Sequence, residues 1–479
     1  MNKTKIVCTL GPACDDDSIL EGMIEGGMRV ARLNFSHGTH REHKMRLDKV
    51  RRAAEKLDVT LGIMLDSKGP EIRIKSFKEG SVTLKDGQEF ILTGEEVEGD
   101  ETRASITYKK LHEEVRPHDR ILLDDGLIIT DVLRIEEHDV VLKVITGGIL
   151  CNNKSLNLPH CRLKLPFITE ADKADFLFGI ENGVDFIAAS FVRSAEDVMA
   201  LRTFLYDNGG EDIWIISKIE NEEGVVNIDE IIAVSDGIMV ARGDLGVEID
   251  AELIPVTQKD IIEKCNIAAK PVITATQMLD SMIRNPHATR AEINDVANAV
   301  FDGTDAVMLS AESAAGKYPV EAVNTMTRVI YRTEASERYF KNLSRGDFTG
   351  LVAATNVIGH AACDIAQKLE VKAIVAPTTG GYTPRLISKF RPHCLLIAAT
   401  HDARVMRRLT LVWGCIPVST PFYDDYETVV SSAVRAGAES GLLSDSDMVV
   451  VTAGTPVNIS GTTNNIRVVR VHDMLNVEN

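Results

Sequence analysis

The feature that most constrains the fold is a series of eight short apolar runs separated by stretches with a helical pattern. Continuous apolar runs of this length are typical of strands buried on both faces, and their alternation with helices favours a parallel sheet. Eight such units are the number that closes a (β/α)8 TIM barrel, which we predict as the α/β core of the chain. The runs are Lys5–Leu10, Val30–Phe35, Leu61–Asp66, Phe186–Phe191, Ile213–Lys218, Gly237–Arg242, Pro271–Thr276 and Ala306–Ser310.

The spacing of the runs predicts one inserted domain. Six of the seven intervals hold 18 to 29 residues, whereas the interval between Asp66 and Phe186 holds 119. A loop of that length without structure of its own is improbable in a compact protein. Strand-like sequence around Asp-Gly turns follows Ser81 and Arg120, which favours β-structure. We predict an all-β domain over residues 70–166, inserted after the third strand and lying over the barrel mouth as a lid.

The chain after the eighth run predicts a C-terminal α/β domain. A helix is predicted at Tyr318–Glu337, Gly346 and Gly350 mark a boundary, and strands then alternate with helical stretches, as in a doubly wound sheet. The predicted strands are Val371–Ala376, Cys394–Thr400, Met448–Thr452 and Ile466–Val471. The predicted domains are 1–69 and 167–340 for the two parts of the catalytic barrel, 70–166 for the lid and 341–479 for an effector-binding domain.

Composition restricts the partners. The formal charge of -18 and the pI near 5.2 argue against non-specific nucleic-acid binding, although local cations can still attract phosphate. No run approaches the ~18 apolar residues of a membrane span, and the first residues lack the apolar core of a signal peptide. The eight cysteines form no Cys-x-x-Cys pair. We therefore expect reduced thiols, no zinc site, no membrane contact and a cytoplasmic location.

Two carboxylates at neighbouring strand ends suggest a divalent metal site. Lys218 and Glu220 lie two residues apart on the fifth run and share a face, while Asp244 follows the sixth run. Two such oxygen ligands, completed by water and substrate, suit Mg²⁺ or Mn²⁺. The alternative is a structural network in which Lys218 and Arg242 neutralise the two carboxylates.

The second and third runs end in residues suited to phosphate and to a monovalent cation. Arg32 presents a guanidinium fork of the kind that binds phosphate. Asn34, Ser36 and Asp66, with the Ser67 carbonyl, supply oxygens for a cation. Ordinary hydrogen bonding between polar residues at a barrel end would give the same pattern.

Two further loops combine a strand end with a helix start, where backbone N–H groups bind anions. Gly243 and Asp244 open a helical stretch that suits a substrate carboxylate, and Thr276 is placed either to hydrogen-bond that carboxylate or to line the barrel. In the last domain a loop of hydroxyls and glycines forms either a phosphate cradle or a plain turn. The loop residues are Thr378, Thr379, Gly380, Gly381 and Thr383.

Motifs from the first residues to the eighth run together resemble the pyruvate kinase family. They are Lys5-Ile-Val-Cys-Thr-Leu-Gly-Pro-Ala, Ala31-Arg-Leu-Asn-Phe-Ser-His-Gly, Leu65-Asp-Ser-Lys-Gly-Pro-Glu-Ile-Arg, Ile216-Ser-Lys-Ile-Glu-Asn, Met239-Val-Ala-Arg-Gly-Asp-Leu-Gly-Val-Glu, Thr274-Ala-Thr-Gln-Met-Leu and Met308-Leu-Ser-Ala-Glu-Ser. The resemblance implies transfer of the phosphoryl group of phosphoenolpyruvate to ADP, giving pyruvate and ATP through a metal-stabilised enolpyruvate that is then protonated. It implies that Arg32 and Lys218 hold the phosphoryl group, and that Gly243, Asp244 and Thr276 bind the substrate carboxylate.

The same resemblance implies Mg²⁺ (or Mn²⁺) and K⁺ as cofactors. Glu220 and Asp244 would bind Mg²⁺, and Glu71 resembles the K⁺-dependent members of the family, because other members have lysine there. The implied K⁺ ligands are Asn34, Ser36, Asp66 and Ser67.

The resemblance also assigns the nucleotide and the final proton. Many members have a lysine where this chain has Ala171, which removes one expected nucleotide contact. The residues implied for the nucleotide are Arg73, His37, Lys154 and Asn34, and those implied for relaying a proton through ordered water are Thr276 and Ser310.

Regulation and assembly are implied as well. The loop at Thr378–Thr383 would bind a phosphorylated activator, and the sequence does not choose between fructose 1,6-bisphosphate, AMP and a sugar monophosphate. Some bacterial members have an extra C-terminal domain, which we do not expect here, and the family is usually homotetrameric.

Two rival classes remain. Barrel lyases that act on enolpyruvate need no Lys218 beside the metal, and a non-catalytic sugar-phosphate sensor would have lost Lys218, Glu220 or Asp244.

Overall fold

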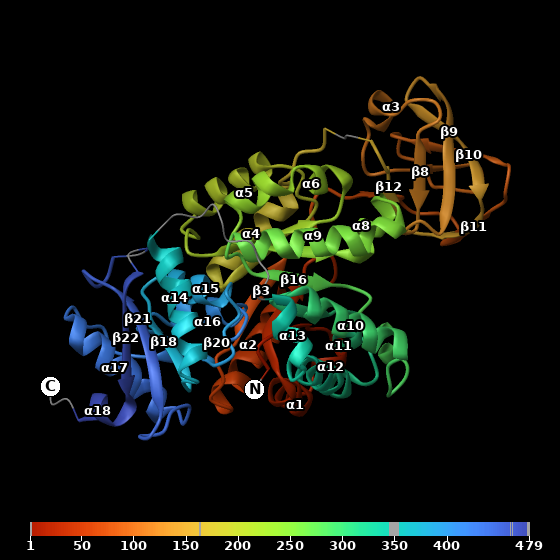
Figure 1. The fold of residues 1–479 in the computed structure, drawn as a ribbon. Coiled ribbons are helices and arrows are strands. Elements are labelled where there is room, and N and C mark those ends of the chain that lie inside the picture. Colours follow the sequence, from red (N-terminus) through yellow and green to blue (C-terminus); the bar gives the residue numbers. More distant parts are fainter. Residues whose placement is uncertain (1, 162–163, 344–353, 460, 462, 477–479) are drawn as a thin grey trace.

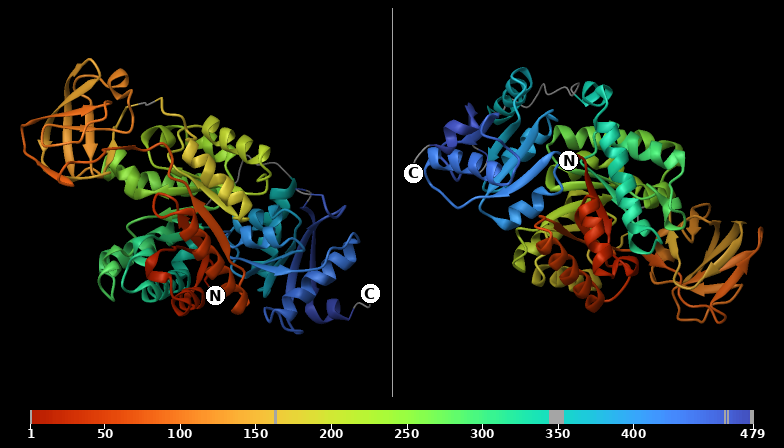
Figure 2. Two further views of the ribbon diagram at one scale, coloured as in Figure 1. Left: turned by 180° about the vertical axis from the view of Figure 1, so that it is seen from behind. Right: turned by 90° about the horizontal axis from the view of Figure 1, so that it is seen from below.

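The computed structural model describes residues 2–161, 164–343, 354–459, 461 and 463–476, and shows three parts in a row (Figure 1). The lid (orange) and the C-terminal domain (blue) lie at opposite ends of a central barrel, and the two further views agree (Figure 2). No helix in the described ranges is long and apolar enough to cross a membrane.

The predicted TIM barrel is confirmed. All eight apolar runs form parallel strands, which close in the order β1-β17-β16-β15-β14-β13-β3-β2. Seven of them are buried along their whole length, and β2 is less buried only at Arg29 and Asn34, which explains the continuous apolar pattern. The strands are β1 (Lys5–Thr9), β2 (Met28–Asn34), β3 (Gly62–Asp66), β13 (Phe186–Ala189), β14 (Trp214–Ile219), β15 (Gly237–Ala241), β16 (Val272–Ala275) and β17 (Ala306–Leu309).

Helices cover the outside of the barrel, and several begin at a capping box, a threonine followed three residues later by an acidic residue. Thr39, Thr169 and Thr289 each accept a hydrogen bond from the backbone of an acidic residue three positions later, which satisfies the first turn. The helices are α1 (Asp17–Gly26), α2 (His40–Lys56), α4 (Glu170–Glu181), α5 (Ala195–Asp207), α6 (Glu222–Val226), α7 (Ile228–Val234), α8 (Arg242–Glu248), α9 (Ile254–Ile267), α10 (Arg290–Asp302), α11 (Ala311–Ala314), α12 (Pro319–Glu334) and α13 (Glu337–Leu343). Short 3-10 turns lie at Pro12–Cys14, Ala251–Leu253 and Asp280–Ile283.

The inserted segment folds as the predicted β-domain around its own apolar core. Its seven-stranded sheet has the order β4-β12-β8-β9-β10-β6-β7, and β11 and β5 form a second, two-stranded sheet. The Asp-Gly turn after Leu84 therefore joins strands of different sheets and does not make a hairpin. The elements are β4 (Ile72–Arg73), β5 (Ser81–Leu84), β6 (Glu89–Thr93), β7 (Arg103–Ser105), α3 (Leu111–Glu114), β8 (Arg120–Leu123), β9 (Ile128–Glu136), β10 (Asp139–Thr146), β11 (Gly148–Cys151) and β12 (Ser155–Asn157).

The C-terminal domain is the predicted α/β unit with one more strand than expected. The sheet has the order β20-β19-β18-β21-β22, with β22 antiparallel to β21. The additional strand β20 contains Pro417, which breaks a strand pattern but is tolerated at a sheet edge. Gly346 and Gly350, the predicted boundary, lie outside the described residues. The elements are α14 (Ala354–Lys368), β18 (Ala373–Pro377), α15 (Tyr382–Ser388), β19 (Leu395–Thr400), α16 (Ala403–Leu409), β20 (Cys415–Ser419), α17 (Tyr426–Glu439), β21 (Met448–Gly454), β22 (Thr463–Arg470) and α18 (Val471–Leu475).

The C-terminal domain packs on the end of the barrel at which the strands begin, which we call the base. Apolar residues of the barrel interior, such as Val7 and Met239, share one buried cluster with Ile387 of α15 and Leu409 of α16. The opposite end, at which the strands finish, is left open to the lid side, and we call it the mouth.

Candidate active site

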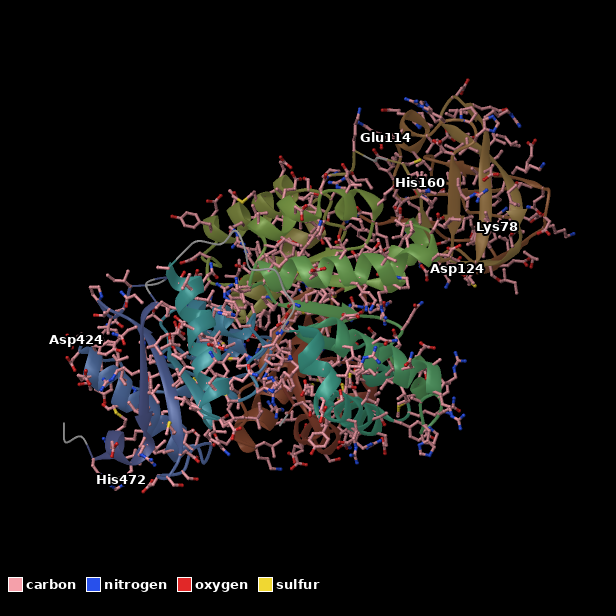
Figure 3. The ribbon with its side chains drawn as sticks, in the orientation of Figure 1. Lys78, Glu114, Asp124, His160, Asp424 and His472 are labelled. Atoms are coloured by element: carbon pink, nitrogen blue, oxygen red, sulfur yellow. The ribbon has the colours of Figure 1, made fainter. Side chains whose placement is uncertain are left out.

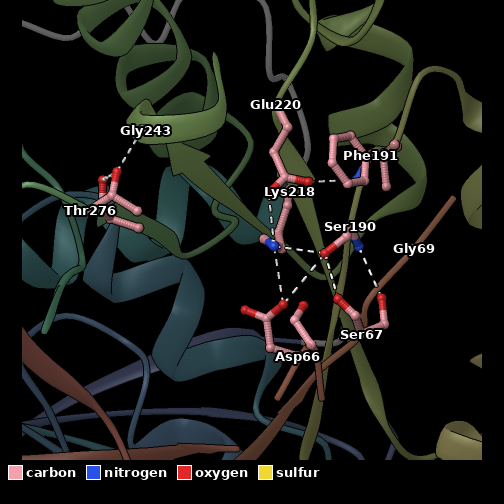
Figure 4. Close-up of polar contacts among 12 residues, drawn as sticks. Asp66, Ser67, Gly69, Ser190, Phe191, Lys218, Glu220, Gly243 and Thr276 are labelled. Atoms are coloured by element: carbon pink, nitrogen blue, oxygen red, sulfur yellow. Dashed lines mark hydrogen bonds and ion pairs between the residues drawn. The ribbon is translucent and has the colours of Figure 1, made fainter. Parts of the chain in front are cut away.

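Lys218 lies at the centre of the polar residues at the barrel mouth (Figure 4). Its Nζ is 3.1 Å from Oδ1 of Asp66 and 2.8 Å from Oε1 of Glu220, and it donates a 2.7 Å hydrogen bond to Oγ of Ser190. These partners come from the ends of β3, β14 and β13, which are neighbours in the barrel. The predicted sharing of a strand face by Lys218 and Glu220 is therefore confirmed.

Arg32 lies beside this cluster and shares its acid. The Arg32 guanidinium donates a 2.6 Å hydrogen bond from Nε to Oδ2 of Asp66 and a 2.8 Å hydrogen bond from Nη1 to Oγ1 of Thr9. Asp66, 0% exposed, is thus held between two cations that are each less than a tenth exposed. Arg32 and Lys218 thus place two cationic donors side by side at the mouth, and such donors suit a phosphoryl group.

The environment shifts the pKa of each member. Burial favours the neutral form of Asp66, but the charges of Arg32 and Lys218 outweigh it and hold its pKa below the usual value. Burial likewise disfavours charged Lys218, but the carboxylates of Asp66, Glu220 and Asp244 outweigh it and raise its pKa. Burial, with the nearby charge of Asp244, raises the pKa of Glu220 against the opposing effect of Lys218. A further cation close to Glu220 and Asp244 would relieve this cost.

The residues predicted to hold a monovalent cation come together on β2 and β3. Asn34 and Asp66 are register partners, and the Asn34 side chain accepts a 3.1 Å hydrogen bond from the backbone of Ser36. The Ser67 carbonyl accepts a 2.7 Å hydrogen bond from Ser190 Oγ. Ser190 lies near the end of the predicted run Phe186–Phe191, and its role comes only from the contacts, in which its hydroxyl joins Lys218 to the Ser67 carbonyl.

A backbone N–H group also holds the carboxylate of Glu220, in addition to Lys218. Its Oε2 accepts a 2.7 Å hydrogen bond from the N–H of Phe191, which has a φ of 56°. A positive φ is strained for an aromatic residue, and such strain concentrates at functional sites.

The predicted carboxylate-binding residues also meet. Oγ1 of Thr276 accepts a 2.7 Å hydrogen bond from the Gly243 N–H and donates one of 2.6 Å to the Ala275 carbonyl. Thr276 has a φ of 66° directly after β16, so its side chain turns towards the start of α8. Asp244, one residue further along α8, is exposed.

Arg242 does not take the role that the ion-pair alternative gave it. Its Nη1 and Nη2 each lie 2.8 Å from a different oxygen of Asp295. This paired contact holds the start of α8 and engages Arg242 with Asp295 instead of Asp244. The sequence did not single out Asp295, because it lies inside a helix and not at a strand end.

The described residues contain no group of three or more His, Cys, Asp or Glu side chains arranged to hold a metal ion. Glu220 and Asp244 fit a divalent ion that takes only two protein carboxylates and completes its shell with substrate and water, as Mg²⁺ does.

The two lid residues predicted for the nucleotide are held within the lid. Arg73 donates from Nε to Oε2 of Glu71 at 2.8 Å and from Nη1 to the Asn153 carbonyl at 2.6 Å. Lys154 forms a 2.7 Å ion pair with Asp124. The structure therefore does not bring these cations onto the barrel cluster.

His37 and Ser310 lie at the mouth on opposite sides of β1. His37 is exposed just after β2, and its carbonyl accepts a 2.9 Å hydrogen bond from His43. Ser310 follows β17 directly, and its N–H donates 2.7 Å to Oε2 of Glu312. The hydroxyl of Ser310 thus stays at the end of a barrel strand, as predicted.

The predicted effector loop borders a cavity in the C-terminal domain. Thr378, Thr379 and Thr383 line it, whereas Gly380 and Gly381 shape the turn, with Gly381 donating a 2.9 Å hydrogen bond to Thr378 Oγ1. Gly381 has a φ of 82°, which favours glycine. Other lining residues include Thr400, His401, Thr420, Tyr423, Ser432 and Thr463.

Comparison with known proteins identifies the family. Residues 1–323 match the model of the pyruvate kinase barrel domain, and residues 356–469 match that of the pyruvate kinase alpha/beta domain. The chain belongs to the pyruvate kinase family. It is 50% identical over 475 residues to pyruvate kinase of Geobacillus stearothermophilus, covering 99% of this chain and 81% of that protein. It is 49% identical over 477 residues to pyruvate kinase of Staphylococcus haemolyticus, with the same coverage.

A solved structure gives the same assignment. The crystal structure of a pyruvate kinase from Cryptosporidium parvum superposes with a TM-score of 0.92 at 41% identity, covering 98% of this chain and 96% of that one. Pyruvate kinase catalysis, in which phosphoenolpyruvate and ADP give pyruvate and ATP, is thus the activity of this chain. The lyase and sensor alternatives are excluded.

Proposed function

We propose that Lys218 and Arg32 hold the transferring phosphoryl group at the barrel mouth. The observation that carries this assignment is the position of Lys218 Nζ, which contacts Asp66, Glu220 and Ser190 at three neighbouring strand ends. Phosphoryl transfer needs positioning and charge neutralisation more than a protein nucleophile. A buried lysine that carboxylates keep protonated supplies a fixed positive charge where negative charge develops.

Glu220 and Asp244 are the residues that would hold Mg²⁺ or Mn²⁺. Such an ion would neutralise negative charge on the phosphoryl and enolate oxygens. The backbone of Phe191 orients Glu220 so that its carboxylate stays at the mouth. Arg242, occupied by Asp295, holds α8 and with it Asp244 in place.

Asn34, Ser36, Asp66 and the Ser67 carbonyl are proposed to hold K⁺. Ser190 supports this arrangement because its hydroxyl donates to the Ser67 carbonyl while it accepts from Lys218. Glu71, whose pKa is raised by burial and by the nearby charge of Asp244 against the effect of Arg73, would gain from a monovalent cation in the same cleft.

The Gly243 N–H and the Thr276 hydroxyl are proposed to bind the carboxylate of phosphoenolpyruvate beside Asp244. The Gly243 N–H donates to the Thr276 hydroxyl in the structure. A bound substrate carboxylate would replace that hydroxyl as the acceptor. With the phosphoryl group near Lys218, the substrate then spans from β14 to β16. Thr276 and Ser310, through ordered water, are proposed to deliver the proton to the enolate carbon.

The nucleotide phosphates are proposed to lie between the barrel and the lid, near His37 and Asn34 on the barrel and near Arg73 and Lys154 on the lid. Because both lid cations are paired within the lid, this assignment requires the lid to move or these pairs to exchange. The lid would also exclude water, which competes with ADP as acceptor.

Regulation and assembly belong to the same proposal. The cavity at Thr378, Thr379 and Thr383 would take a phosphorylated activator, with Gly380 and Gly381 forming the turn beside it. The family supports a homotetramer in the cytoplasm, and the eight free cysteines agree with a reducing compartment.

The test is pyruvate formation from phosphoenolpyruvate and ADP with Mg²⁺, in K⁺ buffer and in K⁺-free buffer. Activity that collapses without K⁺ is expected, and Glu71→Lys should restore activity in K⁺-free buffer by supplying a fixed cation. Activity indifferent to K⁺ would remove the monovalent site. No pyruvate even with added sugar phosphates and AMP would remove the assigned reaction.

A further inference from the structure

Asn157 and His160 of the lid each contact a side chain of the barrel, and both barrel partners lie on helices that follow catalytic strands. Asn157 Nδ2 of the lid donates a 2.9 Å hydrogen bond to Oε1 of Glu248. His160 Nδ1 lies 2.8 Å from Oε2 of Glu222. Figure 3 labels His160 on the side of the lid that faces the barrel helices. The first contact is half-buried, whereas His160 is 66% and Glu222 49% exposed.

On the barrel side, Glu248 is the last residue of α8. The same seven-residue helix carries Gly243 and Asp244 at its start. A helix of this length spans ~10 Å, and i→i−4 hydrogen bonds tie its first turn to its second, so its two ends move together. A displacement of Glu248 therefore also displaces Gly243 and Asp244, the proposed substrate and metal residues.

On the lid side, Asn157 ends β12. This strand pairs with β4, in which Arg73 is the register partner of Ser155. One hydrogen bond thus links α8 to the strand beside the lid's proposed nucleotide-binding arginine.

The surroundings of Glu248 show that the lid lies close against α8. Burial raises the pKa of Glu248, while the Asn157 hydrogen bond and His160 oppose that effect and the charges of Asp244 and Glu222 add to it. At the neighbouring position of α8, Val247 Cγ1 is 3.7 Å from where a Cβ on Gly126 of the lid would lie. The lid thus approaches α8 at two neighbouring positions, through the Asn157 hydrogen bond to Glu248 and through Gly126 beside Val247.

We infer that Glu248 is a positioning residue that couples the orientation of the lid to the placement of Gly243 and Asp244. This inference rests on the proposed roles of those two residues. Phosphoenolpyruvate bound at the start of α8 shifts the lid through Glu248 and Asn157. By linkage, the lid orientation that this favours strengthens phosphoenolpyruvate binding by the same factor.

The test compares amide hydrogen exchange and kinetics in the full-length chain and three variants. In the native chain, phosphoenolpyruvate with Mg²⁺ should protect Gly243–Leu245 and change exchange in Ser155–Asn157 of the lid. In Glu248→Ala and Asn157→Ala the first change should remain and the second should disappear. Glu248→Gln keeps the oxygen that accepts from Asn157, so the lid response should persist.

The kinetic signature is a rise in KM for ADP that exceeds any change in KM for phosphoenolpyruvate. Loss of one partly buried hydrogen bond corresponds to about fivefold in affinity. The double variant Asn157→Ala/Glu248→Ala should be no worse than either single variant, because the two side chains act through one contact. His160→Ala is the matched control, and its loss should stay within about twofold because exposed pairs contribute little.

Different outcomes separate this inference from the proposed function. If phosphoenolpyruvate does not protect Gly243–Leu245 in the native chain, the proposed substrate site is wrong. If that protection appears but the lid of the Glu248→Ala variant responds as in the native chain, with unchanged KM for ADP, the coupling through Glu248 is wrong.

Discussion

The two ends of the barrel both carry buried charge, but they use it differently. At the mouth, Lys218 contacts Asp66 and Glu220, and Asp244 lies exposed nearby. At the base, Asp305 accepts hydrogen bonds from Val272 N–H at 3.0 Å and from Arg391 Nη1 at 2.9 Å. The aspartates of the base pair with arginines of the protein, whereas the charges of the mouth are arranged around a place for substrate.

The base repeats one arrangement at three strands. An aspartate that precedes a barrel strand accepts from the first N–H groups of the neighbouring strand and pairs with an arginine. The three acids are Asp185, Asp236 and Asp305, their backbone donors are Ile63, Ile215 and Val272, and their arginines are Arg407, Arg202 and Arg391. Arg391 and Arg407 come from the C-terminal domain, so Asp305 and Asp185 fasten that domain to the barrel, whereas Arg202 belongs to the barrel itself.

The difference teaches that a polar residue beside a barrel strand is not in itself a sign of catalysis. The role of such a residue depends on the end of the strand at which it lies, because substrate reaches the carboxyl ends and the neighbouring domain covers the amino ends. The following predictions test that division, beginning with the largest effect.

Arg391→Met should be the most destabilising of these changes. Arg391 is 3% and Asp305 6% exposed, and the guanidinium also stacks 4.8 Å from the Trp413 ring. Removing one partner of such a pair leaves a buried charge and costs about 3–5 kcal/mol. Urea unfolding measures the loss. Turnover per folded molecule should be retained, and a variant that is fully stable but inactive would contradict the structural role of the base.

Glu220→Gln should affect function and spare the fold. The amide keeps the shape of the side chain but removes a charge from the proposed metal site, so turnover should fall by about 10²–10³. Mn²⁺ binding, followed by electron paramagnetic resonance, should weaken in parallel. Native Mn²⁺ affinity in this variant would remove Glu220 from the metal site.

Lys5 at the base should make stability depend on pH. Its Nζ donates 2.7 Å to the Cys415 carbonyl, and burial lowers its pKa to about 8. From pH 8 to 10.5 the unfolded chain then binds more protons than the folded chain, so the free energy of unfolding rises with pH, by up to about 3 kcal/mol. Lys5→Met should lack this rise when the two chains are compared across that window. Parallel pH curves would show that Lys5 keeps an ordinary pKa.

Arg202→Ala should have the smallest effect. Arg202 pairs with Asp236 at 2.9 Å, a distance similar to those of the other two aspartate–arginine pairs of the base. The side chains of Arg202 and Asp236 are, however, 34% and 22% exposed. Such a pair is worth about 1 kcal/mol or less. A loss as large as that of Arg391→Met would show that burial does not set the strength of the base contacts.

Much of the fold and of the mouth could be predicted from the sequence, for physical reasons. Buried parallel strands need continuous apolar runs, so all eight appear in the sequence, and strand periodicity places Lys218 and Glu220 on one face. β20 could not be predicted in the same way, because an edge strand tolerates Pro417. The sequence also gives no sign that Lys154 pairs with Asp124 in the lid, since this depends on how distant strands meet.

The most direct test is the turnover of Lys218→Met and Lys5→Met, which make the same substitution at the two ends of one barrel. Both variants should remain folded. Lys218→Met should lose at least about a thousandfold in kcat while still binding phosphoenolpyruvate, and Lys5→Met should turn over at a rate close to that of the native chain. Comparable losses in the two variants, or near-native turnover in Lys218→Met, would contradict the assignment of chemistry to the mouth and of anchoring to the base.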